Sequence, residues 1–250
     1  SKQYEPEYFQ GDFDTHEFPD SVFDENDQEP DTETWREAHW ALKGMVLREE
    51  VYGLDESAQQ ANPYTVSQSN YRVKLIQPKG ENKYGVYFVH SQESLTYDYE
   101  RNPDDPRMGH EFVLEVDEYG NVLDSCTVAY GRRGEDRLQE QKSLKITYSV
   151  NSFINQTQNF YLLGVPKEEW SYEIKNLSLS DTQQYFAFAN VKDHLVGVTD
   201  SADTPLLSWQ GHYYWNPEEE KSFPLGEVSS QALPYRCLLY TSPSPRDPNR

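Results

Sequence analysis

The sequence predicts a mainly β protein, a meandering antiparallel sheet with one short helix near the N-terminus. Aromatic residues are abundant, with 19 Tyr, 11 Phe and 5 Trp, and together with β-branched residues they suit a half-buried pleated surface. Short runs of these residues recur along the chain and are separated by turn-forming residues. A clear helical spacing of apolar residues is found near the N-terminus.

The helix is predicted to begin at Asp31 or Thr32, whose side chains can accept hydrogen bonds from exposed backbone N–H groups. Gly44 supplies its stop. We expect His39 to be a partly buried packing residue of this helix. The residues at helical spacing are Trp35, Ala38, His39 and Leu42.

The predicted strands follow at short intervals, as expected for a sheet whose neighbouring strands are also neighbours in the sequence. Between them lie turn sequences such as Gly164-Val165-Pro166. Residues 178–196 fit either a helix or a strand. The predicted strands are Met45–Tyr52, Tyr64–Ile76, Tyr84–His90, Ser94–Glu100, Glu111–Asp117, Asn121–Tyr130, Lys145–Asn151, Asn159–Leu163, Glu169–Lys175 and Leu206–Trp215.

Residues 1–33 form a distinct acidic segment, with twelve acidic residues against one lysine. A solvated disordered tail has few aromatic residues, whereas this one carries six. We therefore interpret it as an irregular strap whose aromatic rings dock on a neighbouring surface while its carboxylates face water. The alternative is a frayed acidic end. The aromatic residues are Tyr4, Tyr8, Phe9, Phe13, Phe18 and Phe23.

The last fourteen residues, 237–250, read as foreign to the protein. Cys237 to Asp247 match the in-frame translation of a common sequencing adapter, and such a segment carries no information about the native fold. The alternative is a Pro/Ser-rich linker. On the adapter interpretation the native sequence is interrupted near Arg236, Cys126 is the remaining cysteine, and no intrachain disulfide is expected.

The formal net charge of −21 argues against a nucleic-acid partner, because phosphate contacts need clustered Lys and Arg. Here only Arg132 and Arg133 are adjacent. No apolar stretch approaches the roughly 20 residues that cross a bilayer, so direct membrane insertion is not expected. No signal peptide opens the chain.

Patterns of catalytic or ligand-binding residues are weak. Adjacent acids such as Asp104-Asp105 lie in turns, and paired carboxylates there do not supply the facing geometry of glycoside hydrolysis. The histidines lack metalloprotease spacing, and Asp12-x-Asp14 lacks the Gly and Glu of a calcium loop. We predict no catalytic, cofactor-binding or metal site, and we expect Cys126 to be buried packing and Gly131–Gly134 an exposed hairpin tip.

Three stretches resemble a known family when taken in order. They are Trp35–Gly53, Pro63–Val73, and Glu93–Arg107 with Asp117–Val122. They look like the middle/C-terminal region of the B component of bacterial Tc insecticidal toxin complexes (TcdB/TcaC-like, SpvB-containing). The resemblance covers roughly residues 5–235, and we assign the region to 34–236.

The last of these stretches also resembles one unit of the RHS/YD repeat. In this turn Asp117 can cap nearby amides, Gly120 can take positive φ, and Asn121 tolerates left-handed geometry. Tyrosines on successive strands can stack across a sheet. A second turn is expected to be rigid and capped. The structural-motif residues are Asp117, Tyr119, Gly120 and Asn121 in the first turn and Asp104, Asp105 and Pro106 in the second.

The resemblance implies a fold like RHS-type shell wall and a non-catalytic role. In the family the B and C components form a hollow shell that encloses a cytotoxic cargo. The expected partners are the C component and, through the rest of the chain, the A component, in a secreted toxin complex. The alternative function is a carbohydrate-binding or adhesin-like β module that uses the aromatic surface of Trp209–Trp215.

Overall fold

The computed structural model describes residues 2–12, 18–24, 30–179 and 184–241. Two compact units are present. Unit 1 comprises Ser1–Phe112, Thr127–Lys145 and Leu179–Phe186, and unit 2 comprises Val113–Cys126, Ile146–Ser178 and Ala187–Arg250. The described chain is mainly β, as predicted.

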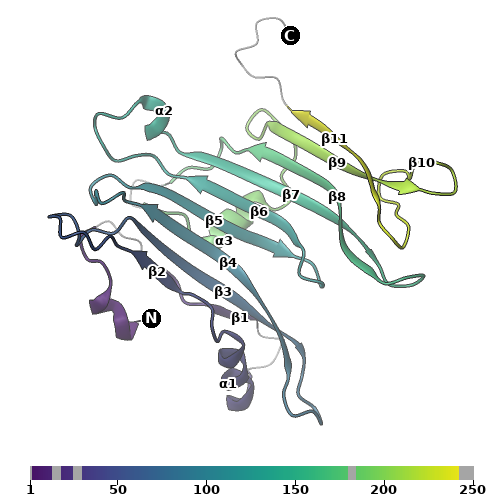
Figure 1. The fold of residues 1–250 in the computed structure, drawn as a ribbon, viewed down its shortest axis with the longest axis horizontal. Coiled ribbons are helices and arrows are strands. Elements are labelled where there is room, and N and C mark those ends of the chain that lie inside the picture. Colours follow the sequence, from purple (N-terminus) through teal and green to yellow (C-terminus); the bar gives the residue numbers. More distant parts are fainter. Residues whose placement is uncertain (1, 13–17, 25–29, 180–183, 242–250) are drawn as a thin grey trace, which may run out of the picture. The chain divides into compact units, whose positions relative to one another are not determined.

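The sheet of unit 1 is mixed but mostly antiparallel (Figure 1). β3 pairs antiparallel with β2 and β4, β4 pairs antiparallel with β5, and β1 pairs parallel with β3. The parallel pair departs from the predicted meander, because β1 comes from the acidic strap and not from a neighbouring hairpin. The strands are β1 (Val22–Asp24), β2 (Arg48–Val51), β3 (Thr65–Gln77), β4 (Val86–Asp98) and β5 (Arg107–Val116, to Phe112 in this unit), and the helices are η1 (Lys2–Glu7), α1 (Thr32–Ala41) and α2 (Gln139–Lys142).

One face of the unit 1 sheet forms the core, since successive side chains of a strand point to opposite faces. Residues facing each other across the strands, such as Val66 and Tyr97, are fully buried. The opposite face carries small hydroxyl residues, and Ser69 and Ser94 meet there with their Oγ atoms 3.2 Å apart. The buried apolar residues of these strands are Val66, Val73, Leu95, Tyr97, Met108 and Phe112.

Unit 2 is an antiparallel sheet in which β7 pairs with β8, β8 with β9, and β9 with both β10 and β11 (Figure 1). Ile154, Val165 and Tyr214 form one buried cluster. Tyr148 faces Tyr172 in register, with stacked rings whose centroids are 6.3 Å apart. The elements are β6 (Val122–Ala129, to Cys126 in this unit), β7 (Lys145–Gln156), β8 (Leu162–Glu173), α3 (Phe188–Leu195), β9 (Leu206–Asn216), β10 (Lys221–Ser222) and β11 (Pro234–Thr241).

Two pairs of predicted strands are single strands in the structure. Tyr84–His90 and Ser94–Glu100 both overlap β4, and Asn159–Leu163 and Glu169–Lys175 both overlap β8. The predicted turn at Gly164 is instead an irregular stretch within β8, where Gly164 has φ +68° and the register with β7 shifts. A bulge absorbs the turn-forming residues without ending the strand.

The predicted N-terminal helix is present as α1, and the Asp31 carboxylate accepts a hydrogen bond from Thr34 N at 2.7 Å. Its buried face differs from the prediction. His39 is exposed, whereas Glu37 is buried and accepts a hydrogen bond from Gly85 N at 2.9 Å. Because its carboxylate has a hydrogen-bond donor, Glu37 can be buried on this helix while His39 is exposed.

Residues 178–196 contain the helix α3, which decides the ambiguity for the part of this segment that is described. Val191 and Leu195 are its fully buried residues. Residues 180–183 lie outside the described part of the chain. Among the residues that the structure describes, no helix is long and apolar enough to cross a membrane.

The two thiols have opposite environments, which gives a direct test of the fold. Cys126 is 2% exposed and burial raises the pKa of its thiol to about 12, whereas Cys237 is exposed. Thiolate is the reactive form, so we expect Cys126 to react with iodoacetamide at neutral pH roughly 100-fold more slowly than Cys237. Mass spectrometry of the labelled chain measures both rates, and equal rates would contradict the burial of Cys126.

Candidate functional site

The predicted Asp-x-x-Gly-Asn turn follows β5 in unit 2 and has the capped form that the residues imply. Asp117 Oδ1 accepts hydrogen bonds from Tyr119 N at 2.9 Å and Asn121 N at 2.8 Å. Gly120 has φ +88°, the left-handed region where a Cβ is strained. Tyr119 is 39% exposed, and its backbone N–H is the part that bonds to Asp117.

A residue that the sequence did not single out completes this turn. Asn155 of β7 donates from Nδ2 to Asp117 Oδ2 at 2.9 Å, and its Oδ1 accepts from Gly164 N at 2.8 Å. Burial raises the pKa of Asp117, but the hydrogen bonds from Asn121 and Asn155 outweigh it, and the net pKa is lowered. The turn is therefore tied to the β7–β8 hairpin through an ionised carboxylate.

The substitution Asp117→Ala is expected to lower the free energy of unfolding by roughly 1–3 kcal/mol, because it leaves amide donors of the turn without their acceptor. Urea denaturation followed by circular dichroism measures the change. Glu118→Ala is the matched control, since Glu118 is the exposed neighbour in the same turn. Equal effects of the two substitutions would show that Asp117 does not cap the turn.

The second predicted turn, Asp104-Asp105-Pro106, lies in unit 1, and its two acids behave differently. Asp104 is exposed, and its backbone N donates to Asn102 Oδ1 at 3.2 Å. Asp105 is 6% exposed, and Pro106 is buried. The hydrogen bonds of Asp105 extend well beyond the turn, to Arg132, Arg137 and two backbone amides.

Asp105 binds the segment that follows Tyr130. Its carboxylate accepts from Arg132 Nη2 at 2.8 Å, Arg137 Nε at 2.7 Å, Arg133 N at 2.9 Å and Gly134 N at 3.0 Å. The prediction that Gly131–Gly134 is an exposed hairpin tip is therefore wrong, because all four residues are partly buried and fold back onto Asp105. Arg132 and Arg133 are the one adjacent pair of basic residues in a strongly acidic chain. This pair was the sequence signal that could have predicted an ion pair with a carboxylate here.

A buried row of hydrogen-bonding side chains crosses β3, β4 and β5 in unit 1, and no sequence pattern predicted it. Asn70 Nδ2 donates to Glu93 Oε1 at 2.7 Å, and Glu93 N donates to Asn70 Oδ1 at 3.1 Å. Glu93 Oε2 lies 3.4 Å from His110 Nε2, and His110 Nδ1 lies 3.1 Å from Tyr130 Oη. Asn70, Glu93 and His110 are at most 2% exposed.

This chain of polar groups attaches covering segments to the sheet. Asn70 Nδ2 also lies 3.3 Å from Pro19 O in the strap, and Tyr130 Oη accepts from Phe186 N at 3.1 Å. Burial lowers the pKa of His110 and outweighs the Glu93 carboxyl group, which raises it. The lowered pKa favours the neutral ring, whose Nδ1 is paired with the Tyr130 hydroxyl.

The cavity of unit 1 does not reach the Glu93–His110 pair. It has a volume of about 400 Å³, and neither Glu93 nor His110 is among its lining residues. Among the described residues, no group of three or more His, Cys, Asp or Glu side chains is arranged to hold a metal ion. The hydrogen bonds described above attach Pro19 and Phe186 to the two ends of this row of side chains. The lining residues include Met108, Tyr130, Arg133, Lys142, Leu144 and Tyr185.

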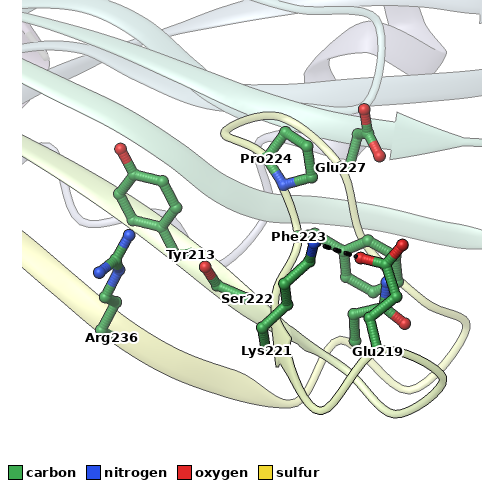
Figure 2. A pocket seen from close by; sticks show the side chains of 9 residues that line it. Tyr213, Glu219, Lys221, Ser222, Phe223, Pro224, Glu227 and Arg236 are labelled. Carbon is green, nitrogen blue, oxygen red and sulfur yellow. Dashed lines mark ion pairs between the residues drawn. The ribbon is translucent and has the colours of Figure 1, made fainter.

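The aromatic surface at Trp209–Trp215 lies in unit 2, and its rings are engaged with neighbours. Trp209 Nε1 donates to Glu168 at 3.2 Å, and its ring centroid is 5.8 Å from that of Trp170. Tyr213 lines an open cavity of about 510 Å³, and the Arg236 guanidinium covers its ring at 4.7 Å (Figure 2). Packed rings favour a wall over an open sugar-binding platform.

These observations define the class of protein: a β-sheet module in which buried polar side chains bind loops and the N-terminal segment to long, mostly antiparallel strands. A model of the family described as the insecticide toxin TcdB middle/C-terminal region matches residues 37–181. The chain belongs to this family. A search of curated proteins found no match.

Solved structures of toxin complexes share the fold. The crystal structure of TcdB2-TccC3 without the hypervariable C-terminal region is 24% identical, with a TM-score of 0.76, over 94% of this chain and 12% of that chain. The crystal structure of TcdB2-TccC3 is 25% identical, with a TM-score of 0.70, over 83% and 11%. The Photorhabdus luminescens Tc holotoxin pore is 23% identical, with a TM-score of 0.72, over 94% and 12%. The chain therefore spans about an eighth of the length of these relatives.

Proposed function

We propose that this chain is a non-catalytic structural segment of a toxin-complex B component, and that it helps to build the hollow shell that encloses and delivers a cytotoxic partner. The observation that carries the proposal is the TM-score of 0.76 over 94% of the chain with a TcdB2-TccC3 structure. Family membership supports it independently. Long strands with one packed face and one face of small hydroxyl residues suit a wall.

The partners follow from the same proposal. A C component closes the shell and supplies the cargo, and the A component binds through the rest of the chain, in keeping with the likeness to TcdB2-TccC3 and to a holotoxin pore. The complex acts outside the bacterial cell. The acidic charge of −21 supports the absence of a nucleic-acid partner and of direct membrane insertion.

Protection of the cargo tests the shell. The full-length B component is co-expressed with its C component, and the complex is treated with protease. We expect the cargo to be protected in the unaltered complex and cleaved when the B component carries Asp105→Ala, because that substitution loosens the wall of unit 1. Asp104→Ala is the control. A cargo cleaved equally in the unaltered complex would contradict the shell.

The boundaries of the segment are part of the proposal. We assign 34–236 to the B-component region and 1–33 to a strap; in the strap, Phe18 lies 6.0 Å from His110 and Phe23 lies 5.2 Å from Trp35, ring to ring. Phe13 lies outside the described residues. Residues 237–250 remain assigned to adapter; Cys237–Thr241 pair with β9 as part of an exposed strand, and the nucleotide record under these residues decides the assignment.

The isolated chain is expected to associate, because sheet edges with unpaired backbone groups attract further strands. Exposed apolar residues at the β2 edge add to this tendency, among them Val51 at 43% exposure and Leu54 at 91%. Light scattering after size exclusion measures the oligomeric state. A monomer that melts cooperatively would count against a wall segment that needs neighbours.

One observation favours the carbohydrate-binding alternative: Tyr213 lines an open cavity (Figure 2). A glycan array with the unaltered chain and with Trp209→Ala and Trp215→Ala variants separates the two functions. Specific binding that both variants lose would favour the alternative.

A further inference from the structure

Within unit 1, the short peptide Tyr8–Asp12 of the strap is held by side chains of β2 and of the residues after β4 and β6. These five residues belong to no helix or strand. The Tyr8 ring lies under the Arg48 guanidinium at 4.6 Å. Phe9 N donates to both carboxylate oxygens of Glu50 at 3.1 Å. A peptide held in this way resembles a bound ligand more than an integral part of the sheet.

Asp12 is the buried end of this peptide. Its side chain is 3% exposed, which corrects the expectation that the strap carboxylates face water. Oδ2 accepts from Tyr99 Oη at 2.8 Å, and Oδ1 accepts from Arg133 Nη1 at 2.9 Å. A buried carboxylate needs such donors, and charge-assisted bonds of this length are strong.

The aromatic residue of the peptide fits the same surface. The Phe9 ring meets Tyr99 edge to face, with centroids 5.4 Å apart. It also fills the space beside Gly11, where an added Cβ would lie 2.5 Å from the ring. Tyr99 therefore contacts both Phe9 and Asp12, and the lack of a side chain at Gly11 leaves room for the Phe9 ring.

We propose that Arg48, Glu50, Tyr99 and Arg133 form a peptide-recognition seat for a short acidic, aromatic segment, and that Tyr8–Asp12 occupies it as a latch that detaches without unfolding of the sheet. The seat selects a carboxylate through Arg133 and Tyr99, an aromatic ring through Tyr99, and a second ring through Arg48. Detachment without unfolding is the expected behaviour of a segment that contributes no strand pairing. This inference goes beyond the proposed function and stands on contacts within unit 1.

Hydrogen exchange of the full chain, read by mass spectrometry, tests the latch. Asp12→Asn keeps the size of the side chain and removes its charge. We expect the amides of residues 9–12 to exchange at least about 10-fold faster, while the protection of β4 is unchanged. Asp24→Asn is the matched control, because Asp24 also lies in the strap and forms an ion pair, with Arg72 of β3. This substitution should leave the exchange of residues 9–12 unaffected.

A second variant identifies the seat itself. Tyr99→Phe keeps the ring against Phe9 and removes the hydroxyl that donates to Asp12. It should accelerate exchange of residues 9–12 on its own, while the protection of β4 is unchanged. The proposal is overturned if Asp12→Asn leaves the exchange rates of these amides unchanged. It is also overturned if the amides of β4 exchange faster to the same extent, since the contact is then part of the core.

Discussion

Asp105→Ala is expected to lower the free energy of unfolding by roughly 3–5 kcal/mol, the usual cost of removing one partner from a buried ion pair. The carboxylate is 6% exposed and accepts bonds from Arg132, Arg137 and two backbone amides. We expect the lower end of the range, because the Arg137 side chain is 40% exposed and water can solvate it. Urea denaturation should show a lower midpoint with an unchanged slope.

The effect of this substitution should depend on pH. Burial raises the pKa of Asp105, but the hydrogen bonds from Arg132 and Arg137 outweigh it, and the folded pKa is well below the ordinary value. A lowered carboxyl pKa contributes stability that is present above the unfolded pKa of about 3.9 and is lost as the pH falls toward the folded pKa. The difference between the unaltered chain and the variant should therefore be full at pH 7 and smaller at pH 3.

Asp104→Ala is the control for both measurements. Asp104 is the exposed neighbour of Asp105, and substitutions at exposed positions usually change stability by within about 0.5 kcal/mol. If Asp104→Ala and Asp105→Ala had the same effect, the hydrogen bonds of Asp105 would not be what stabilises this region.

Asn70→Leu is the second large effect: we expect the free energy of unfolding to fall by roughly 3 kcal/mol, because the substitution leaves buried polar groups of Glu93 without partners. Asn70 is 1% exposed and both donates to and accepts from Glu93. Leu has a similar size, so a cavity does not explain the loss. The same denaturation experiment measures it.

The neighbour of Asn70 supplies the comparison. Ser69 faces the opposite side of the sheet and pairs with the Ser94 hydroxyl at 3.2 Å, so Ser69→Ala should cost about 1 kcal/mol or less. Adding Glu93→Gln to Asn70→Leu should recover part of the loss, since an amide is less costly to bury unpaired than a carboxylate. A further loss in the double variant would contradict the account of the polar chain.

Alternation and capping residues were sufficient to predict most strands and α1. β3, β5, β6 and β9 lie within a few residues of their predicted bounds, because apolar side chains at every second position specify a half-buried strand. The cap of the turn at Asp117 was also readable, since Tyr119 N and Asn121 N, which donate to Asp117, are close to it in the sequence; the bond from Asn155 of β7 was not. Local chemistry decides these features.

The misplaced features depend on partners far away in the sequence. β4 and β8 continue through residues that break a strand locally, because pairing with β3 and β7 holds them extended. Gly131–Gly134 has the composition of an exposed tip, and Asp105, 29 residues before Gly134, draws it inward. Glu37 is buried on an amphipathic helix because Gly85 donates to it.

The sequence by itself determined the class of this protein: strands from alternation, one helix from its cap, a capped turn after β5, and the family from ordered motifs. Tertiary structure alone decided which acids are buried. Five acidic side chains of the described residues are buried, and each accepts a hydrogen bond from a segment distant in the sequence: Asp12, Glu37, Glu93, Asp105 and Asp124. A carboxylate looks the same in every local sequence, and only the fold supplies the partners that offset its loss of hydration.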